Sequence, residues 1–252
     1  MLRSRIVRIA LMSDIHANLE ALEACLEHAR ARAVDAYALL GDFVGYGADA
    51  TEVVDIVMRL ASQGAVVLKG NHDAAIERVD SYFNDDTRLS LERARAMLRD
   101  DQKRFLAGLP LVVVEGAVTF VHASALHPDR WNYVDSASAA HQCSEAAGTT
   151  YTFCGHMHDQ QLYFGVTGAH MRPFTPSPGV AIPMRGTRAW LAIAGSVGQP
   201  RDRNPAAAYA IFDDAKREIT FFRVPYDHVA AAAKIRAAGL SEALAYRVEM
   251  GI

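Results

Sequence analysis

Five short clusters of Asp, Asn and His residues stand before residue 160, and each follows an apolar run. They are Asp14-Ile15-His16, Gly41-Asp42, Gly70-Asn71-His72-Asp73, Val121-His122 and Gly155-His156-Met157-His158. Together they offer carboxylate oxygen, amide oxygen and imidazole nitrogen, the mixed donor set that suits a pair of catalytic divalent metal ions. One such cluster arises easily by chance, whereas five in series indicate a metal site.

The spacing within two of the clusters suggests how their side chains converge. Asp14 and His16 lie two residues apart at the end of an expected strand. In an extended backbone such residues point to the same side, so both could reach one ion. His156 and His158 have the same spacing.

The remaining donors differ in what they would contribute. Asp42 follows a glycine, which permits close backbone approach, and its two carboxylate oxygens could bridge two ions. Asn71 would bind a metal through a neutral oxygen and add no further negative charge. His122 adds another imidazole.

The apolar runs and the segments between them predict strands alternating with helices. Strands are expected at 6–12, 36–40 and 65–69, with helices at 18–32 and 51–61. This order predicts a largely parallel sheet with crossover helices. Ligands of such sheets bind beyond the carboxyl ends of the strands, where Asp14, Asp42 and Asn71 lie.

After Pro110 the chain becomes rich in strand patterns. Strands are expected at 111–114, 117–121, 151–154, 161–165, 189–194, 209–213 and 218–224, and helices at 227–238 and 241–246. Residues 165–188 are rich in Gly and Pro and predict a loop with one short strand at most. Without a linker or an internal repeat, residues 1–252 are predicted to form one domain.

Residues 81–108 are charged and lack a strand pattern, which predicts a small helical insertion beside the site. Arg88, Arg95 and Arg99 would lie along one side of its helix. A solvated face is the favoured interpretation of this stripe. The alternative is a wall that attracts an anionic substrate.

Composition narrows the class of protein. The chain has 252 residues, of which 51% are hydrophobic, and a formal net charge of −3. It can bury a sizeable core, and it lacks the basic excess expected of a coat on nucleic acid or anionic membrane. Three widely spaced cysteines, no signal-peptide core and no apolar stretch long enough for a bilayer predict a cytoplasmic protein with reduced thiols.

The five ordered clusters resemble the motifs of the calcineurin-like metallophosphoesterase superfamily. Two further segments, 41–47 and 195–201, resemble its small bacterial, phosphodiesterase-like members. The resemblance implies an α/β fold, namely a four-layer αββα sandwich of two mixed β-sheets flanked by helices.

The resemblance also implies two divalent metal ions. The ligands of the first would be Asp14, His16, Asp42 and His158, and those of the second Asp42, Asn71, His122 and His156. The donors accept Mn, Fe, Zn, Ni or Co, so the sequence does not identify the metals. His72 would be the catalytic residue that supplies a proton to the leaving group. Asp73 would either orient His72 or cap a following helix, and capping is favoured.

One motif departs from a better-known branch of the superfamily. Phosphoprotein phosphatases carry Asp-Arg-Gly where this chain has Gly45-Tyr46-Gly47. The carboxylate that would pair with the catalytic histidine and the arginine that would grip phosphate are both missing. Arg201 could replace that grip, although simple exposure is its alternative interpretation. Tyr46 could line the substrate pocket.

The predicted function is hydrolysis of a small, soluble phosphate ester by a metal-bridging hydroxide, with a diester favoured over a monoester. The alternatives are a phosphomonoesterase, a Ser/Thr-type phosphoprotein phosphatase and a non-catalytic metal-binding scaffold. No nucleic-acid or membrane partner is expected, and no motif encodes the oligomeric state. Residues 81–108 and 165–201 are expected to shape the substrate pocket.

Overall fold

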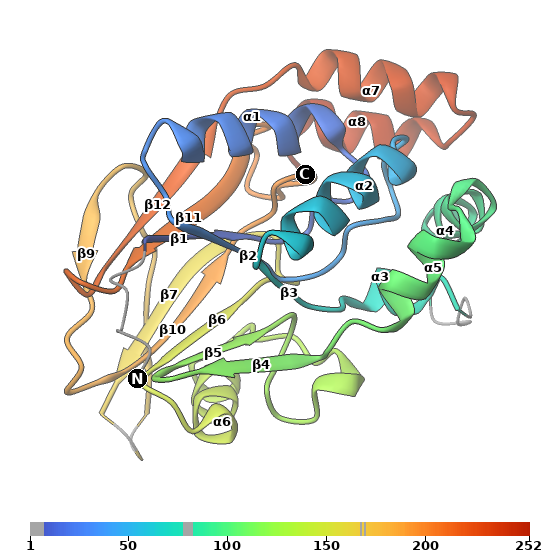
Figure 1. Ribbon diagram of the computed structural model, residues 1–252. Helices are drawn as coiled ribbons and strands as arrows, with labels where there is room; N and C mark the ends of the chain where they lie inside the picture. Colours follow the sequence, from blue (N-terminus) through green and yellow to red (C-terminus); the bar gives the residue numbers. More distant parts are fainter. Residues whose placement is uncertain (1–7, 78–82, 167, 169) are drawn as a thin grey trace.

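Two six-stranded sheets pack face to face in this computed structural model, which describes residues 8–77, 83–166, 168 and 170–252 (Figure 1). The first sheet, in the order β3-β2-β1-β11-β12-β9, comprises Val66–Val67, Ala36–Leu39, Arg8–Met12, Ala207–Asp213, Glu218–Val224 and Ala181–Pro183. The second, in the order β4-β5-β6-β10-β7-β8, comprises Val112–Glu115, Val118–Val121, Tyr151–Cys154, Ala189–Ala194, Gln160–Gly165 and Arg172–Phe174.

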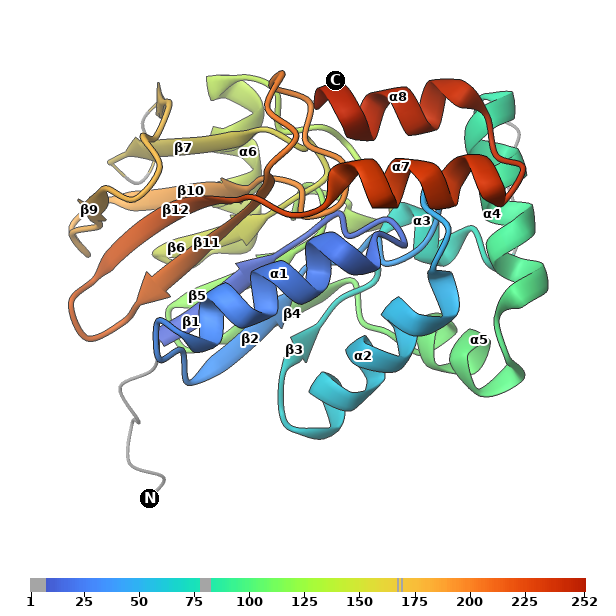
Figure 2. The ribbon, with the colours of Figure 1, turned by 90° about the horizontal axis from the view of Figure 1, so that it is seen from above.

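Helices cover the outer faces of both sheets. The helices α1 to α8 are Leu19–Arg30, Ala50–Ser62, Asn71–Ala74, Asp85–Met97, Asp100–Ala107, Ala137–Ala147, His228–Ala237 and Glu242–Met250, and a short 3-10 helix spans Pro128–Arg130. Figures 1 and 2 show α1, α2 and α7 over the first sheet and α6 over the second. The predicted four-layer αββα sandwich is therefore confirmed.

The core between the sheets explains why the strands read as apolar runs. Phe120, Phe153, Phe212 and Phe221 are fully buried there, between the two sheets. Two further clusters fill the spaces under α1 and α2 and under α6. Burial on both faces of a strand favours a continuous apolar run over an alternating pattern.

Three parallel strands in each sheet position the site. In the first sheet β1, β2 and β3 run parallel, and in the second β5, β6 and β10 do so. Their carboxyl ends meet at one end of the sandwich. Most strands begin and end within two residues of the predicted limits, but β3 is only two residues long, shorter than the predicted 65–69.

Two predictions about connections were incomplete. The segment 165–188 contains two short strands, β8 and β9, where one at most was expected. Helix α6 was not predicted at all, although Ser136 caps its first turn and Gly148 ends it in a left-handed conformation. These residues are the usual signals of a helix start and a helix end.

The insertion is helical, as predicted, over the described part of 81–108; residues 81 and 82 lie outside the described residues. Its arginines form a solvated face. Arg88 pairs with Asp85 and Glu92 on its own helix, and Arg99 pairs with Asp55 and Asp101. The alternative of an anion-attracting wall is wrong, because Arg88 and Arg99 pair with acidic neighbours and none of Arg88, Arg95 and Arg99 lines the cavity described below.

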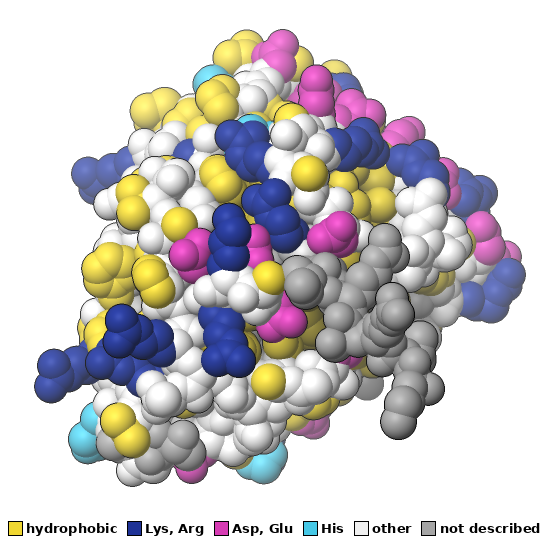
Figure 3. All heavy atoms as spheres, turned by 60° about the vertical axis from the view of Figure 1, so that its left-hand side comes forward, with side chains coloured by type: hydrophobic (Ala, Val, Ile, Leu, Met, Phe, Trp, Pro, Cys, Tyr) yellow, Lys and Arg dark blue, Asp and Glu magenta, His cyan; other side chains and the backbone are white. Residues whose placement is uncertain are grey.

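The surface carries charges of both signs. On the face shown in Figure 3, Lys and Arg side chains lie in several separate groups with Asp and Glu side chains between them. This agrees with the small net charge. Within the described residues, no helix combines the length and the apolar character needed to cross a bilayer.

Candidate metal centre

All seven residues predicted to bind metal lie together at the carboxyl ends of the parallel strands. Asp14 and His16 follow β1, Asp42 follows β2, Asn71 follows β3, His122 follows β5, and His156 and His158 follow β6. None of these side chains belongs to a residue more than 7% exposed. The fold therefore gathers polar donors that are far apart in the sequence into one buried group.

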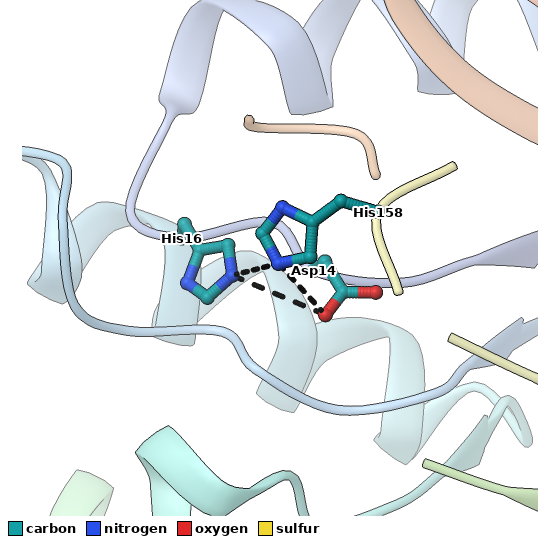
Figure 4. Close-up of side chains that lie close together, drawn as sticks. All are labelled: Asp14, His16 and His158. Carbon is teal, nitrogen blue, oxygen red and sulfur yellow. Dashed lines mark hydrogen bonds and ion pairs between the residues drawn. The ribbon is translucent and has the colours of Figure 1, made fainter. Parts of the chain in front are cut away.

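Asp14, His16 and His158 form the first group (Figure 4). Nε2 of His158 lies 3.4 Å from Oδ1 of Asp14, and Nε2 of His16 lies 3.9 Å from the same oxygen. The two Nε2 atoms are 3.1 Å apart. Three potential ligand atoms thus surround one point.

Backbone carbonyls determine which nitrogen of each ring carries the proton. Nδ1 of His16 lies 3.2 Å from the carbonyl of Val44, and Nδ1 of His158 lies 2.6 Å from that of Gln199. A carbonyl only accepts hydrogen bonds, so each Nδ1 donates and each Nε2 presents a lone pair. The two lone pairs face each other, and Oδ1 of Asp14 has no hydrogen-bond partner. Converging acceptors of this kind fit a cation.

The pKa values of this group follow from burial. Desolvation lowers the pKa of His16 and of His158 well below the usual value, so both rings are neutral. Desolvation also raises the pKa of Asp14 to about 6. Neutral imidazoles can donate their lone pairs to a metal, and a cation would offset the cost of ionising the buried carboxylate.

Asp42, His122 and His156 form a second group, with Asn71 beside it. Nε2 of His122 lies 3.2 Å from Nδ1 of His156, 3.2 Å from Oδ1 of Asn71 and 3.5 Å from Oδ2 of Asp42. Nδ1 of His122 bonds to the carbonyl of Leu40. Burial disfavours charge on His122, but the carboxylate of Asp42 outweighs it and raises the pKa of His122 to about 9.

One oxygen of Asp42 faces both groups. Oδ2 lies 3.5 Å from Nε2 of His122 and 3.8 Å from Nε2 of His16, while Oδ1 accepts a hydrogen bond from the backbone N–H of His72. Burial opposes ionisation of Asp42, yet the nearby histidines hold its pKa well below the usual range. The geometry fits a carboxylate shared between two ions.

Left-handed backbone conformations, which the sequence did not predict, bring these side chains together. Asp14, His16, Asp42, His156 and His158 all have positive φ angles, between 50° and 67°. The expectation that two-residue spacing acts through extended backbone was therefore wrong. The rings of His156 and His158 belong to different groups. Each left-handed residue costs on the order of 1–3 kcal/mol, and hydrogen bonds between the loops after β1 and β2 hold this conformation.

His72 is positioned by rings and not by a carboxylate. Its Nδ1 is buried without a hydrogen-bond partner, and its ring contacts those of His16, Tyr46 and Phe83 at centroid distances of 4.7, 4.7 and 5.3 Å. A Cβ at Gly45 would collide with Nδ1, so this glycine makes room for the ring. Burial lowers the pKa of His72. Its Nε2, 4.0 Å from Oδ2 of Asp42, faces the ligand groups.

Asp73 neither orients His72 nor caps a following helix, the two roles that the sequence suggests for it. It lies in the first turn of α3, where Oδ2 accepts from the N–H groups of Gly70 and Asp42 and Oδ1 from that of Phe43. It therefore caps the helix that contains it and ties the loop after β2 to the loop after β3. The structure gives it no contact that would orient His72.

A cavity of about 510 Å³ opens in front of the ligand groups. Its lining comprises Asp42, Tyr46, Asn71, His72, Phe83, Asn84, Thr87, Arg130, Trp131, Asn132, Tyr133, His156, His158 and Arg201. Both residues proposed for substrate contact, Tyr46 and Arg201, are present. The Arg201 guanidinium lies 6.0 Å from the ring centroid of Tyr46 and donates to Oε1 of Gln199, while its Nε is buried without a partner.

One wall of the cavity was wrongly predicted. Of the described residues in 165–201, only Arg201 contributes to the lining, because β8 and β9 lie at the far edges of the sheets. Residues 130–133 form that wall instead, and the sequence reasoning overlooked them. The available signal was a pair of aromatic residues, Trp131 and Tyr133, in a loop soon after the motif histidine His122.

Comparison with known proteins agrees with this geometry. An uncharacterized protein of Methanocaldococcus jannaschii is 33% identical over 258 residues, covering 96% of this chain and 98% of that protein. This relative is archaeal, so the similarity is not confined to bacteria. The crystal structure of a metallophosphoesterase from Sphaerobacter thermophilus is 35% identical, with a TM-score of 0.86 over 98% of this chain and 99% of that one.

A more distant structure and a family model extend the comparison. The crystal structure of a hypothetical protein from Pyrococcus horikoshii OT3 is 19% identical, with a TM-score of 0.78 over 98% of this chain and 99% of that one, and shows the same fold. The model of the calcineurin-like phosphoesterase superfamily domain matches residues 7–217. The chain therefore belongs to the calcineurin-like phosphoesterase superfamily and is a metal-dependent phosphoric ester hydrolase.

Proposed function

We propose that this protein holds two divalent metal ions and hydrolyses a small phosphate ester, with a diester preferred over a monoester. The observation that carries the proposal is the position of Asp42 Oδ2 between two groups of converging ligand atoms. Asp14, His16, Asp42 and His158 would hold one ion, and Asp42, Asn71, His122 and His156 the other. Mixed oxygen and nitrogen donors accept Mn, Fe, Zn, Ni or Co.

Bound ions would lower the pKa of a water molecule and neutralise the charge of the phosphate oxygens. The residues of the chain prepare that chemistry. Val44, Leu40 and Gln199 orient three of the histidine rings through their backbone carbonyls, so Nε2 of each of these rings faces the ligand groups. Asp73 holds the loop that presents Asp42.

His72 and Arg201 would act on the ester itself. Nδ1 of His72 is buried, so Nε2 is the atom that would hold a proton beside the leaving oxygen. The ring is neutral, because burial lowers its pKa, and a neutral Nε2–H can donate a hydrogen bond to that oxygen. Arg201 lines the cavity, and its guanidinium group would bind a phosphate oxygen.

Two alternatives are less well supported. A phosphoprotein phosphatase would need a carboxylate partner for His72, and Gly45 occupies that space. A non-catalytic scaffold has no need of seven buried Asp, Asn and His side chains gathered at the carboxyl ends of the strands. The preference for a diester rests on resemblance to phosphodiesterase-like members alone. We also infer that the chain acts as one domain, because Tyr46 beside the ligands packs against the cluster formed by α7 and α8.

The test is hydrolysis of bis-p-nitrophenyl phosphate and of p-nitrophenyl phosphate by chelator-stripped protein with Mn²⁺ added back. We expect turnover that depends on metal and is absent from Asp42→Asn. The ratio of the two rates ranks diester against monoester, and a phosphopeptide assay tests the phosphatase alternative. No turnover with Mn²⁺, Ni²⁺, Zn²⁺, Co²⁺ or Fe²⁺, despite two bound ions per chain, would contradict the proposal.

A further inference from the structure

We infer that Trp131 and Tyr133 form an aromatic platform that selects phosphate esters carrying a planar ring system, such as a nucleobase. This inference rests on the proposed function, because it concerns the group attached to the phosphate. Both residues line the cavity. Neither belongs to a motif that the sequence reasoning used.

The platform is built directly onto the second ligand group. The ring of Tyr133 stacks on that of His156, with centroids 4.3 Å apart and an interplanar angle of 17°. The ring of Trp131 meets that of His122 at 5.9 Å and 70°, an edge-to-face contact. A planar group that stacks on these rings would therefore lie beside the second ligand group. A phosphate attached to it could then reach the ligand residues.

Local structure holds both rings at the rim of the cavity. His127 and Trp131 adopt left-handed conformations on either side of the 3-10 helix Pro128–Arg130. Val134, only 2% exposed, anchors the chain immediately after the platform. Tyr133 nevertheless remains 54% exposed. An anchored but exposed aromatic ring beside a ligand cavity is available for stacking with a planar ligand.

A positive charge lines the same cavity. Arg201 lies over Tyr46, next to His158 of the first ligand group. The cavity therefore offers a cation for a phosphate and aromatic rings for a planar group attached to it. An ester that carries both groups matches this lining.

The size and the remaining lining support a small molecule with polar edges. A volume of about 510 Å³ falls within the range typical of small-molecule sites, roughly 300–1,000 Å³. Arg130 and Asn132, both exposed, flank Trp131 and offer hydrogen-bond donors to the edge of a ring. Stacking on an aromatic side chain tolerates any base, because every base has a π-face.

The test compares adenosine 5′-phosphate with ribose 5-phosphate, and the 5′-methyl phosphodiester of adenosine with that of ribose. Within each pair the phosphate ester is the same and only the base differs. We expect kcat/KM to favour the adenosine compound about tenfold or more, mainly through KM. Trp131→Ala and Tyr133→Ala should bring the ratio close to one, whereas Tyr133→Phe should retain most of the preference. Tyr246→Ala, which removes an exposed ring on α8, is the matched control and should leave the ratio unchanged.

Fluorescence gives a second readout that does not depend on turnover. The chain has two tryptophans, and Trp190 is only 5% exposed whereas Trp131 is half-buried at the cavity. Adenosine 5′-phosphate should quench the emission of the protein, and ribose 5-phosphate should not. Trp131→Phe should abolish the quenching.

The outcomes separate this inference from the proposed function. Equal kcat/KM values for both esters in the unmodified protein, or a preference that survives both alanine substitutions, would overturn the platform and leave the phosphoesterase intact. Absence of turnover on every ester, including bis-p-nitrophenyl phosphate, would instead remove the proposed function. If Trp131→Ala lost its bound metals, Tyr133→Ala, Tyr133→Phe and the quenching experiment would still test whether the platform selects planar rings.

Discussion

The bottom of the cavity and its rim differ in burial and in the way their side chains are held. The ligand residues are at most 7% exposed, and three of their four histidines bond to backbone carbonyls through Nδ1. Around the rim, Arg130, Asn132 and Tyr133 are exposed. The bottom is thus held by burial and by hydrogen bonds to the backbone, whereas the rim depends on ring contacts and on the course of one loop.

This contrast suggests a division of labour. A fixed set of donors can bind ions without a cost in rearrangement, which favours the same chemistry whatever ester arrives. A rim that contributes little to the core can change without unfolding the protein. We therefore expect substitutions at the bottom to affect turnover or stability, and substitutions at the rim to affect the choice of substrate.

The largest expected effect is at Asp42, whose Oδ2 faces both ligand groups. Asp42→Asn should lower kcat/KM for bis-p-nitrophenyl phosphate by more than about a thousandfold and reduce the binding of both ions. Asp14→Asn should weaken only one ion. Metal content per chain and initial rates measure this, with Asp101→Asn on an exposed surface pair as control. Loss of the same single ion from both variants would contradict the shared role.

His72 comes next, because it is buried among ligands but is assigned to the ester. His72→Ala should keep two ions and lower kcat by about 10²–10⁴-fold, most for esters with poor leaving groups. His170→Ala, at an exposed position that is not part of the cavity lining, is the control. His72 also lies within reach of a ligand set with His16 and Asp42. Loss of bound metal from His72→Ala would reassign it as a ligand.

Arg201 tests the role of positive charge in the lining of the cavity. Removing a charged hydrogen bond to phosphate should raise KM by about 10- to 100-fold in Arg201→Ala, with a smaller change in kcat. Arg201→Lys should recover part of the affinity, since it restores the charge but not the planar fork. Arg95→Ala, an exposed position on α4, serves as the control. An unchanged KM would leave Arg201 as a merely exposed residue.

The smallest expected effect is on the stability of the protein. It compares the bottom of the cavity, at Asp73, directly with the rim, at Tyr133. Asp73→Ala removes the acceptor of three buried N–H groups and should lower the free energy of unfolding by about 1–3 kcal/mol. Tyr133→Ala should change it by less than about 0.5 kcal/mol. Urea unfolding of metal-free protein measures both. Equal decreases in the free energy of unfolding for the two variants would mean that the rim contributes as much to stability as the bottom of the cavity.

Much of the fold could be predicted because its signals are local. Strands β6, β10 and β12 begin and end where the apolar runs predict, since each run is long enough to be buried on its own. Helix α6 was missed because its Ala- and Ser-rich sequence carries a weak apolar stripe. The two short strands β8 and β9 were missed because Pro and exposed residues dominate them.

Residue types and patterns a few residues long are enough to predict the order of the Asp, Asn and His clusters, their placement after strands and the donor chemistry they offer. The long-range contacts could be known only from the folded chain. His16 faces His158, 142 residues away, Asp42 turns one oxygen toward both groups, and Trp131 and Tyr133 border the cavity. Such contacts depend on which strands pair and on left-handed loop conformations, and these are set by packing across the whole sandwich.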